Sequence, residues 1–164
     1  VCSSDLSEVN QRSMEARSRK LIAFRQTLNP PQLQGPETGD LLVVAWGSTL
    51  GTVVEATSTL RREGYSVSAL HLRFLSPLEP GLQEIFQRFG QVMTIEINYS
   101  DPPGNGASAG RRYAQLASLL RAQTLVDVDC RSRVPGIPLT PNMVRDMIMD
   151  KLHADNEVLN EQAQ

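Results

Sequence analysis

The sequence predicts an α/β domain in which helices are layered on a mainly parallel β-sheet. Three observations support this fold class. Apolar runs typical of strands alternate with helical apolar patterns from about residue 40 onward, and the segments between them are short. A third is the apolar run at residues 41–46, which does not alternate with polar residues. Such a run is typical of a strand buried on both faces of a parallel sheet.

A separate N-terminal segment precedes this regular pattern. Its first six residues, VCSSDL, resemble one reading frame of a common sequencing adapter, so we expect residues 1–6 to be non-native. Cys2 would then not belong to the protein. Because the chain begins with Val, we also expect it to be the C-terminal part of a longer polypeptide.

Residues 7 to about 26 are predicted to form a helix, because they are highly charged and contain no Gly or Pro. The helix should end before Pro30, since a residue that precedes proline is pushed out of the helical region. The next residues, up to about 40, have the composition of a linker and include a candidate short edge strand at 32–34.

From residue 40 onward, four predicted strands alternate with four predicted helices. The helices show apolar residues at i, i+3, i+4 and i+7, as at Leu82, Ile85, Phe86 and Phe89. The strands are predicted at 41–46, 67–72, 92–97 and 125–129, and the helices at 52–63, 80–89, 113–122 and from 141 to about 152.

Capping residues mark several of these boundaries. Gly64 and Gly90 follow two of the predicted helices, as glycine commonly does at a helix C-terminus. Thr140 is a good N-cap, and Pro141 suits the first position of the last helix. We expect the tail after His153 to be solvated.

Composition narrows the class of protein. The chain has 164 residues of which 40% are apolar, enough for one domain with a real core. Its 16 basic and 18 acidic residues give a net charge of −2, so we expect neither a nucleic-acid nor a membrane partner. The two cysteines, Cys2 and Cys130, form no metal or iron–sulfur spacing, and we expect a reduced cytoplasmic protein.

The turn after the first buried strand is the first candidate site. Gly47, Ser48 and Thr49 open it, but it matches neither the dinucleotide fingerprint nor the phosphate loop. Free N–H groups at the start of the following helix could receive an anion. The hydroxyls of Ser48 or Thr49 could equally cap those N–H groups, and we favour this structural interpretation.

A second cluster, HLRFLSPLEP, lies at the carboxyl end of the next strand, where open α/β sheets place ligands. Arg73 could pair with a carboxylate or a phosphate. His71 is expected to be a packed, hydrogen-bonded residue rather than a catalyst. Pro77 and Pro80 should give the loop a fixed shape.

Glu96 and Asn98 form the third candidate, again at the end of a strand. Glu96 could be a partly desolvated base, or it could pair with Arg73 across the neighbouring strand end, and we favour the ion pair. Asn98 suits a turn of the chain.

The fourth candidate is the long connection at residues 99–112, which is either a partner-contacting arm or mobile. Arg111 and Arg112 close it, and they could engage acidic groups on another subunit or be solvated. Asp127 and Asp129 should point the same way from a strand, but two carboxylates make a weak metal site, and we predict none. No catalytic set assembles from these residues, so the chain looks catalytically incomplete.

Taken in order, the motifs LLVVAWGSTLGTVVEA, LHLRFLSPLEP, VMTIEIN, YAQLASLLRAQTLVDVD and GIPLTPNMV resemble one family. It is the C-terminal domain of the α subunit of 2-oxoacid:ferredoxin (acceptor) oxidoreductases, with the 2-oxoglutarate branch the best fit. The resemblance implies a three-layer α/β/α fold like the transketolase C-terminal domain. Its sheet would have five strands, and the first, near residues 32–34, would run antiparallel.

The resemblance also implies a domain organisation. Residues 7–28 would be a helix from the end of a preceding domain, 29–39 a linker, 40–153 the transketolase C-terminal-like domain and 154–164 a solvated tail. The connection at 99–112 is longer than in many relatives, which makes any inherited contact there doubtful.

The implied enzyme decarboxylates a 2-oxoacid oxidatively, forms the acyl-CoA and reduces ferredoxin. Thiamine diphosphate, Mg²⁺ and iron–sulfur clusters would bind to the preceding domain, the β subunit or a further component, and not to this chain. Its own role would be assembly with the preceding domain and the β subunit, with Arg73, Glu96 and the 99–112 connection as candidate contacts.

Two other functions stay open at this point. The chain could be a stand-alone Rossmann-like nucleotide- or CoA-binding module, in which Gly47, Ser48 and Thr49 would contact a CoA phosphate. It could also be the C-terminal domain of a transketolase-type or pyruvate dehydrogenase-type enzyme.

Overall fold

The computed structural model describes residues 3–102 and 110–162, and their strands form one five-stranded sheet. The strand order is β1-β3-β2-β4-β5. The four longer strands are parallel, and β1 pairs antiparallel with β3, as predicted. The bounds are β1 (Leu33–Gln34), β2 (Gly39–Trp46), β3 (Val67–Leu72), β4 (Phe89–Glu96) and β5 (Val128–Ser132).

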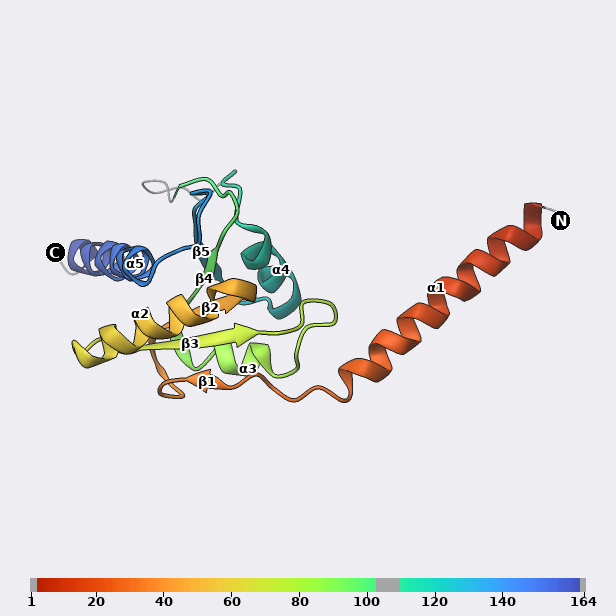
Figure 1. Ribbon diagram of the computed structural model, residues 1–164, viewed down its shortest axis with the longest axis horizontal. Helices are drawn as coiled ribbons and strands as arrows, with labels where there is room; N and C mark the ends of the chain where they lie inside the picture. The colour runs from red at the N-terminus through yellow and green to blue at the C-terminus, as the bar shows by residue number, and fades with distance from the viewer. Residues whose placement is uncertain (1–2, 103–109, 163–164) are drawn as a thin grey trace.

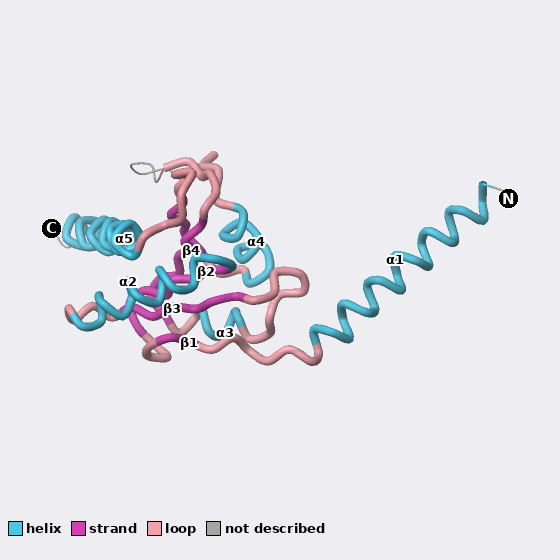
Figure 2. Tube along the Cα trace, viewed as in Figure 1, coloured by secondary structure: helices cyan, strands magenta, loops and turns pink. Residues whose placement is uncertain are grey.

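Helices cover both faces of this sheet, which confirms the three-layer fold (Figures 1 and 2). One face packs on α3 and α4, and the other packs on α2 and α5. A short 3₁₀ turn, η1, joins β2 to α2. The bounds are α1 (Ser3–Arg25), η1 (Gly47–Thr49), α2 (Leu50–Arg62), α3 (Leu82–Phe86), α4 (Gln115–Thr124) and α5 (Pro141–Gln162).

The central strand β2 divides the core in two. Leu42 and Val44 pack into the α3/α4 layer, whereas Leu41, Val43 and Ala45 pack into the α2/α5 layer. Each fully buried side chain of this size contributes roughly 1.5–3 kcal/mol to folding. The unbroken apolar run therefore has the predicted cause, which is burial on both faces.

Several predicted boundaries were wrong. The helix predicted at 80–89 shortens to Leu82–Phe86, because Gly81 is left-handed at φ 78° and Phe89 already pairs with Gly39 in the sheet. The strand predicted at 125–129 starts later, at Val128, because Leu125 ends α4 with φ 58°. Helix α5 does not stop near residue 153 but continues to Gln162.

Helix α1 differs from the others because it leads away from the sheet (Figure 1). An edge-to-face contact at 5.2 Å joins the Phe24 ring near its end to the Phe74 ring after β3. Among the described residues, no helix has both the length and the apolar content needed to cross a membrane. Cys2 and residues 103–109 of the long connection lie outside the described part of the chain.

Candidate functional site

The strand register brings most of the predicted site residues to one edge of the sheet. Trp46 of β2 lies opposite Leu72 of β3, and Glu96 of β4 lies opposite Ser132 of β5. The carboxyl ends of the four parallel strands therefore meet, as in other open α/β sheets. A cleft of about 250 Å³ opens there, lined by residues 46–49 and 95–98.

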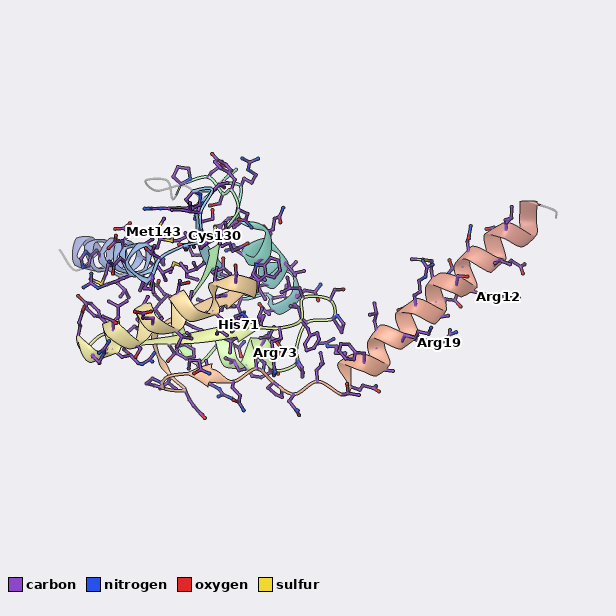
Figure 3. All side chains as sticks on the ribbon, viewed as in Figure 1. Arg12, Arg19, His71, Arg73, Cys130 and Met143 are labelled. Atoms are coloured by element: carbon purple, nitrogen blue, oxygen red, sulfur yellow. The ribbon has the colours of Figure 1, made fainter. Side chains whose placement is uncertain are left out.

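The turn between β2 and α2 forms one wall of this cleft. Gly47 is left-handed at φ 63°, a conformation that L side chains rarely adopt. The Thr49 hydroxyl donates to the Trp46 carbonyl oxygen at 2.8 Å, and Nε2 of His71 lies 3.1 Å from the Gly47 carbonyl oxygen. His71, labelled in Figure 3, is thus half-buried and hydrogen-bonded, as predicted.

The expectation that a hydroxyl of this turn caps α2 was wrong. Thr49 occupies the N-cap position, but no side chain makes a capping hydrogen bond there. Its hydroxyl is turned back to Trp46 because the 3₁₀ turn places that carbonyl within reach. The turn connects strand to helix as expected, but it leaves the start of α2 without a side-chain cap.

Glu96 caps α4 instead, from a different element of the fold. Its carboxylate is 1% exposed and receives the backbone N–H groups of Leu116 at 2.8 Å and Ala117 at 3.0 Å. The Thr94 hydroxyl and the Asn98 amide each donate to it at 2.7 Å. An anion accepting two amides in the first turn of a helix is favoured by the helix dipole. All of these donors hold the carboxylate in a structural role.

The predicted ion pair between Glu96 and Arg73 does not form. Strand β2 lies between β3, which precedes Arg73, and β4, which carries Glu96. Arg73 is 74% exposed at its side chain, and its Nε lies 3.8 Å from Oε1 of Glu79. Asn98 turns toward Glu96 and holds the carboxylate from the strand end.

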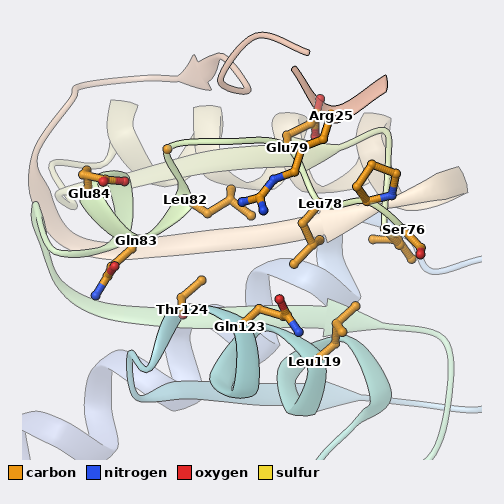
Figure 4. Close-up of a pocket in the computed structure, with 13 residues that line it drawn as sticks. Arg25, Ser76, Leu78, Glu79, Leu82, Gln83, Glu84, Leu119, Gln123 and Thr124 are labelled. Atoms are coloured by element: carbon orange, nitrogen blue, oxygen red, sulfur yellow. The ribbon is translucent and has the colours of Figure 1, made fainter. Parts of the chain in front are cut away.

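Glu79 is a buried carboxylate that the sequence did not single out, since the proline-rich loop around it has no periodicity. Its Oε2 accepts the backbone N–H of Arg73 at 3.2 Å. It lines a pocket of about 350 Å³ between the loop after β3 and α4. In Figure 4, Ser76 and Leu78 from the loop face Leu119 and Gln123 from α4 across this pocket.

Arg111 lies inside the chain's own ion-pair cluster and is not solvated. Its Nη1 donates to Oδ1 of Asp129 at 2.8 Å, and its Nη2 donates to the Cys130 carbonyl oxygen at 3.1 Å. Arg131 and Lys151 lie 2.9 Å and 3.5 Å from Oδ2 of the same carboxylate. These contacts also cover the free edge of β5, because the Cys130 N–H donates to Asp129.

Burial opposes ionisation of both members of the Arg111–Asp129 pair. The hydrogen bond from Arg111, together with the charges of Arg131 and Lys151, outweighs burial and lowers the pKa of Asp129. The same hydrogen bond raises the pKa of Arg111 despite its burial. Both groups are therefore charged in the folded chain.

The other predicted charges at this edge lie apart from the cluster. Arg112 is 67% exposed, stacks on the Tyr99 ring at 4.5 Å and pairs with Asp101. Asp127 and Asp129 do not point together from a strand, since Asp127 precedes β5 and pairs with Arg121 in the solvent.

We tested whether the described residues fit the cofactors that the resemblance implies. An iron–sulfur cluster requires several thiolates, whereas Cys130 is the single cysteine among the described residues and is buried. Within the same residues, no group of three or more His, Cys, Asp or Glu side chains could hold a metal ion. The described residues do not fit these groups, and we derive no chemistry through them.

Comparison with known proteins gives consistent relatives. Residues 33–111 match the family model "Transketolase, C-terminal domain". The chain is 36% identical over 124 residues to 2-oxoglutarate oxidoreductase subunit KorA of Mycobacterium tuberculosis. This alignment covers 71% of the present chain and 17% of KorA. It is also 40% identical over 68 residues to the α subunit of 2-oxoacid:ferredoxin oxidoreductase 1 of Aeropyrum pernix. This second alignment covers 40% of the present chain and 11% of the Aeropyrum subunit.

A solved structure agrees with these relatives. The 2-oxoglutarate:ferredoxin oxidoreductase of Magnetococcus marinus, with 2-oxoglutarate, coenzyme A and succinyl-CoA bound, aligns with a TM-score of 0.69 at 25% identity. The alignment covers 87% of this chain and 23% of that one. The chain therefore spans less than a quarter of the length of each of these three proteins.

Proposed function

We propose that the chain is a non-catalytic assembly domain of the α subunit of a 2-oxoacid:ferredoxin oxidoreductase. Two findings support this proposal: residues 33–111 match the transketolase C-terminal domain family, and the chain is related to subunits of such enzymes. The enzyme would oxidatively decarboxylate a 2-oxoacid, with 2-oxoglutarate favoured, to an acyl-CoA. Thiamine diphosphate, Mg²⁺ and iron–sulfur clusters would be held by other domains and subunits of a cytoplasmic complex.

The observation that carries the assembly role is the state of Glu96. It is the buried carboxylate nearest the cleft at the strand ends, and a catalytic base there would need a lone pair free for substrate. Four protein donors already occupy its two oxygens. Another wall of the cleft is the Gly47–Thr49 turn, which contacts the Trp46 carbonyl oxygen and the His71 side chain.

The partners under this proposal are a preceding domain of the same subunit, a β subunit and, through the complex, ferredoxin. Residues 7–28, which contain most of α1, would be the end of that preceding domain. This fits α1, which leads away from the sheet (Figure 1). Its exposed apolar side chains include Val9, Ile22 and Phe24. Arg73 and Arg112, both exposed, are candidate contacts.

The competing function is a CoA-binding module, and one observation favours it. Helix α2 starts without a side-chain cap beside Gly47, Ser48 and Thr49, so its N–H groups could donate hydrogen bonds to a CoA phosphate. Titration calorimetry of the chain with CoA, adenine nucleotides and thiamine diphosphate separates the two functions. The assembly proposal expects no binding in the sub-millimolar range, and such binding by any of these ligands would overturn it.

A further inference from the structure

The exposed apolar side chains of the described domain gather on one face. We define the carboxyl-edge surface as the six exposed large apolar residues at the carboxyl ends of the parallel strands. Their exposed fractions run from 42% for Ile97 to 66% for Val134. Outside α1, Leu125 is the remaining exposed large apolar residue among those described. The members of the surface are Trp46, Leu50, Ile97, Tyr99, Val134 and Ile137.

The strand ends bring four members of this surface close together. Trp46 and Ile97 line the same cleft, and Leu50 begins the helix that follows the turn. The backbone N–H of Arg133 donates to the Glu96 carbonyl oxygen, so Val134 leaves β5 beside Ile97. An apolar concentration of this kind on one face marks an interaction site more often than chance exposure does.

An unused hydrogen-bond acceptor lies in the same cleft. Oδ1 of Asn98 is inaccessible to solvent and has no hydrogen-bond partner among the described residues. Its identity as the oxygen is fixed, because the other end of the amide must donate to the Glu96 carboxylate. A buried acceptor without a donor is costly, and a partner could supply the missing N–H or O–H only if the Asn98 side chain moved on binding.

The accessible charges around this surface are mainly positive. Arg73, Arg112 and Arg133 are exposed at the strand ends. Of the nearby carboxylates, Glu79 and Glu96 are buried, and Asp101 is the exposed one. Arg73 and Arg112 each pair with one of these carboxylates, whereas Arg133 has no ion pair among the described residues.

We propose that the carboxyl-edge surface binds a companion subunit whose contact face is apolar at its centre and carries carboxylates around it. This inference rests on the proposed assembly function and names the face that performs it. Apolar contact would supply affinity, and arginine–carboxylate pairs at the rim would set the orientation and the rate of encounter.

A second copy of the chain fits this surface less well. In a two-fold dimer the same patch meets itself, so the three exposed arginines would face like charges. A small anion also fits less well, because the Glu96 carboxylate is among the residues that line the cleft.

The chain contains its own reporter for this face, because Trp46 is its only tryptophan. We would replace it biosynthetically with 5-fluorotryptophan in the complete 164-residue chain and add the purified β subunit of a 2-oxoglutarate oxidoreductase. The expected result is a shifted fluorine resonance, loss of its sensitivity to solvent isotope, and binding that weakens as salt rises.

Two variants, each checked by circular dichroism for an unchanged fold, locate the contact. Ile97→Asp should weaken binding about tenfold or more, as for a central interface residue, and Arg133→Glu should mainly slow association. Leu125→Asp is the matched control, since Leu125 is also exposed but follows α4, at the opposite ends of the strands. It should change nothing.

The outcomes separate this inference from the proposed function. If the β subunit binds while the Trp46 resonance and the Ile97→Asp affinity are unchanged, the surface is wrong and the assembly function stands. If the folded chain does not bind the β subunit at all, both are overturned. If ultracentrifugation shows that the chain self-associates, and the Trp46 fluorine resonance shifts with that self-association, the companion is overturned in favour of a second copy. If CoA or inorganic phosphate alone shifts the Trp46 resonance, the companion is overturned in favour of an anion.

Discussion

Replacing Glu96 by alanine should destabilise the domain strongly, because one side chain satisfies four buried or half-buried donors. Two of these are backbone N–H groups in the first turn of α4, which has no cap of its own. Losing an N-cap costs about 1 kcal/mol. Leaving further buried donors without an acceptor costs about 1–3 kcal/mol, and more when the lost acceptor was charged.

We therefore expect the free energy of unfolding to fall by about 3–5 kcal/mol, the range for a mutation that breaks a buried charged network. For a chain of this size each kcal/mol corresponds to roughly 2–4 °C, so Tm should fall by about 10 °C. Urea denaturation followed by far-ultraviolet circular dichroism measures the first quantity, and a thermal scan measures the second.

Glu96→Gln is the informative companion variant. Its amide oxygen can still accept from one pair of donors, and the Thr94 hydroxyl can rotate to accept from the new NH₂ group. One N–H of α4 then loses its acceptor, so the expected loss is about 1–2 kcal/mol. The control is Glu55→Ala, which removes an exposed carboxylate on α2 and should change stability by less than about 0.5 kcal/mol. The capping interpretation is refuted if Glu96→Ala behaves like this control, or if glutamine is as damaging as alanine.

Three further predictions follow from the β5 edge and the turn at the strand ends. Folding lowers the pKa of Asp129 from its usual 3.8. The ionised Asp129 side chain therefore contributes stability that is fully present above pH 3.8 and is lost as the pH falls through the lower pKa of the folded chain. Asp129→Asn should remove this part of the acid dependence, measured by urea titrations at successive pH values. Arg111→Ala should speed aggregation, measured by light scattering, because it uncovers the Cys130 carbonyl on the edge strand, and an unchanged rate would contradict that role. Gly47→Ala should cost about 1–2 kcal/mol through its positive φ alone, since nothing lies within 4 Å of the added Cβ, whereas Gly51→Ala in α2 should be neutral or stabilising.

The layered fold was predictable because its signals are local. The unbroken apolar run that forms β2 marks side chains that are buried in the core, and so does the helical spacing of Leu82, Ile85 and Phe86. Boundaries failed where two elements compete for the same residues. Phe89 has the spacing of a helix, but it pairs with Gly39 because the sheet gains a hydrogen-bonded strand there.

The candidate site was predictable only in part. The sequence placed His71, Arg73, Glu96 and Asn98 at strand ends, and parallel strands bring such ends together. Which of them would touch depends on strand order, which no local pattern contains. The interposed β2 separates Arg73 from Glu96 and leaves Glu96 to α4.

By itself the sequence determined the fold class, the positions of the buried strands and the related family, because periodicity and ordered motifs are written along the chain. The tertiary structure decided which groups the charged residues contact. A carboxylate on β4 caps a helix 20 residues away, and an arginine before α4 covers an edge strand 19 residues further on. Hydrogen bonds of this kind join atoms that only folding brings within 3 Å or so of each other, so no pattern along the chain records them.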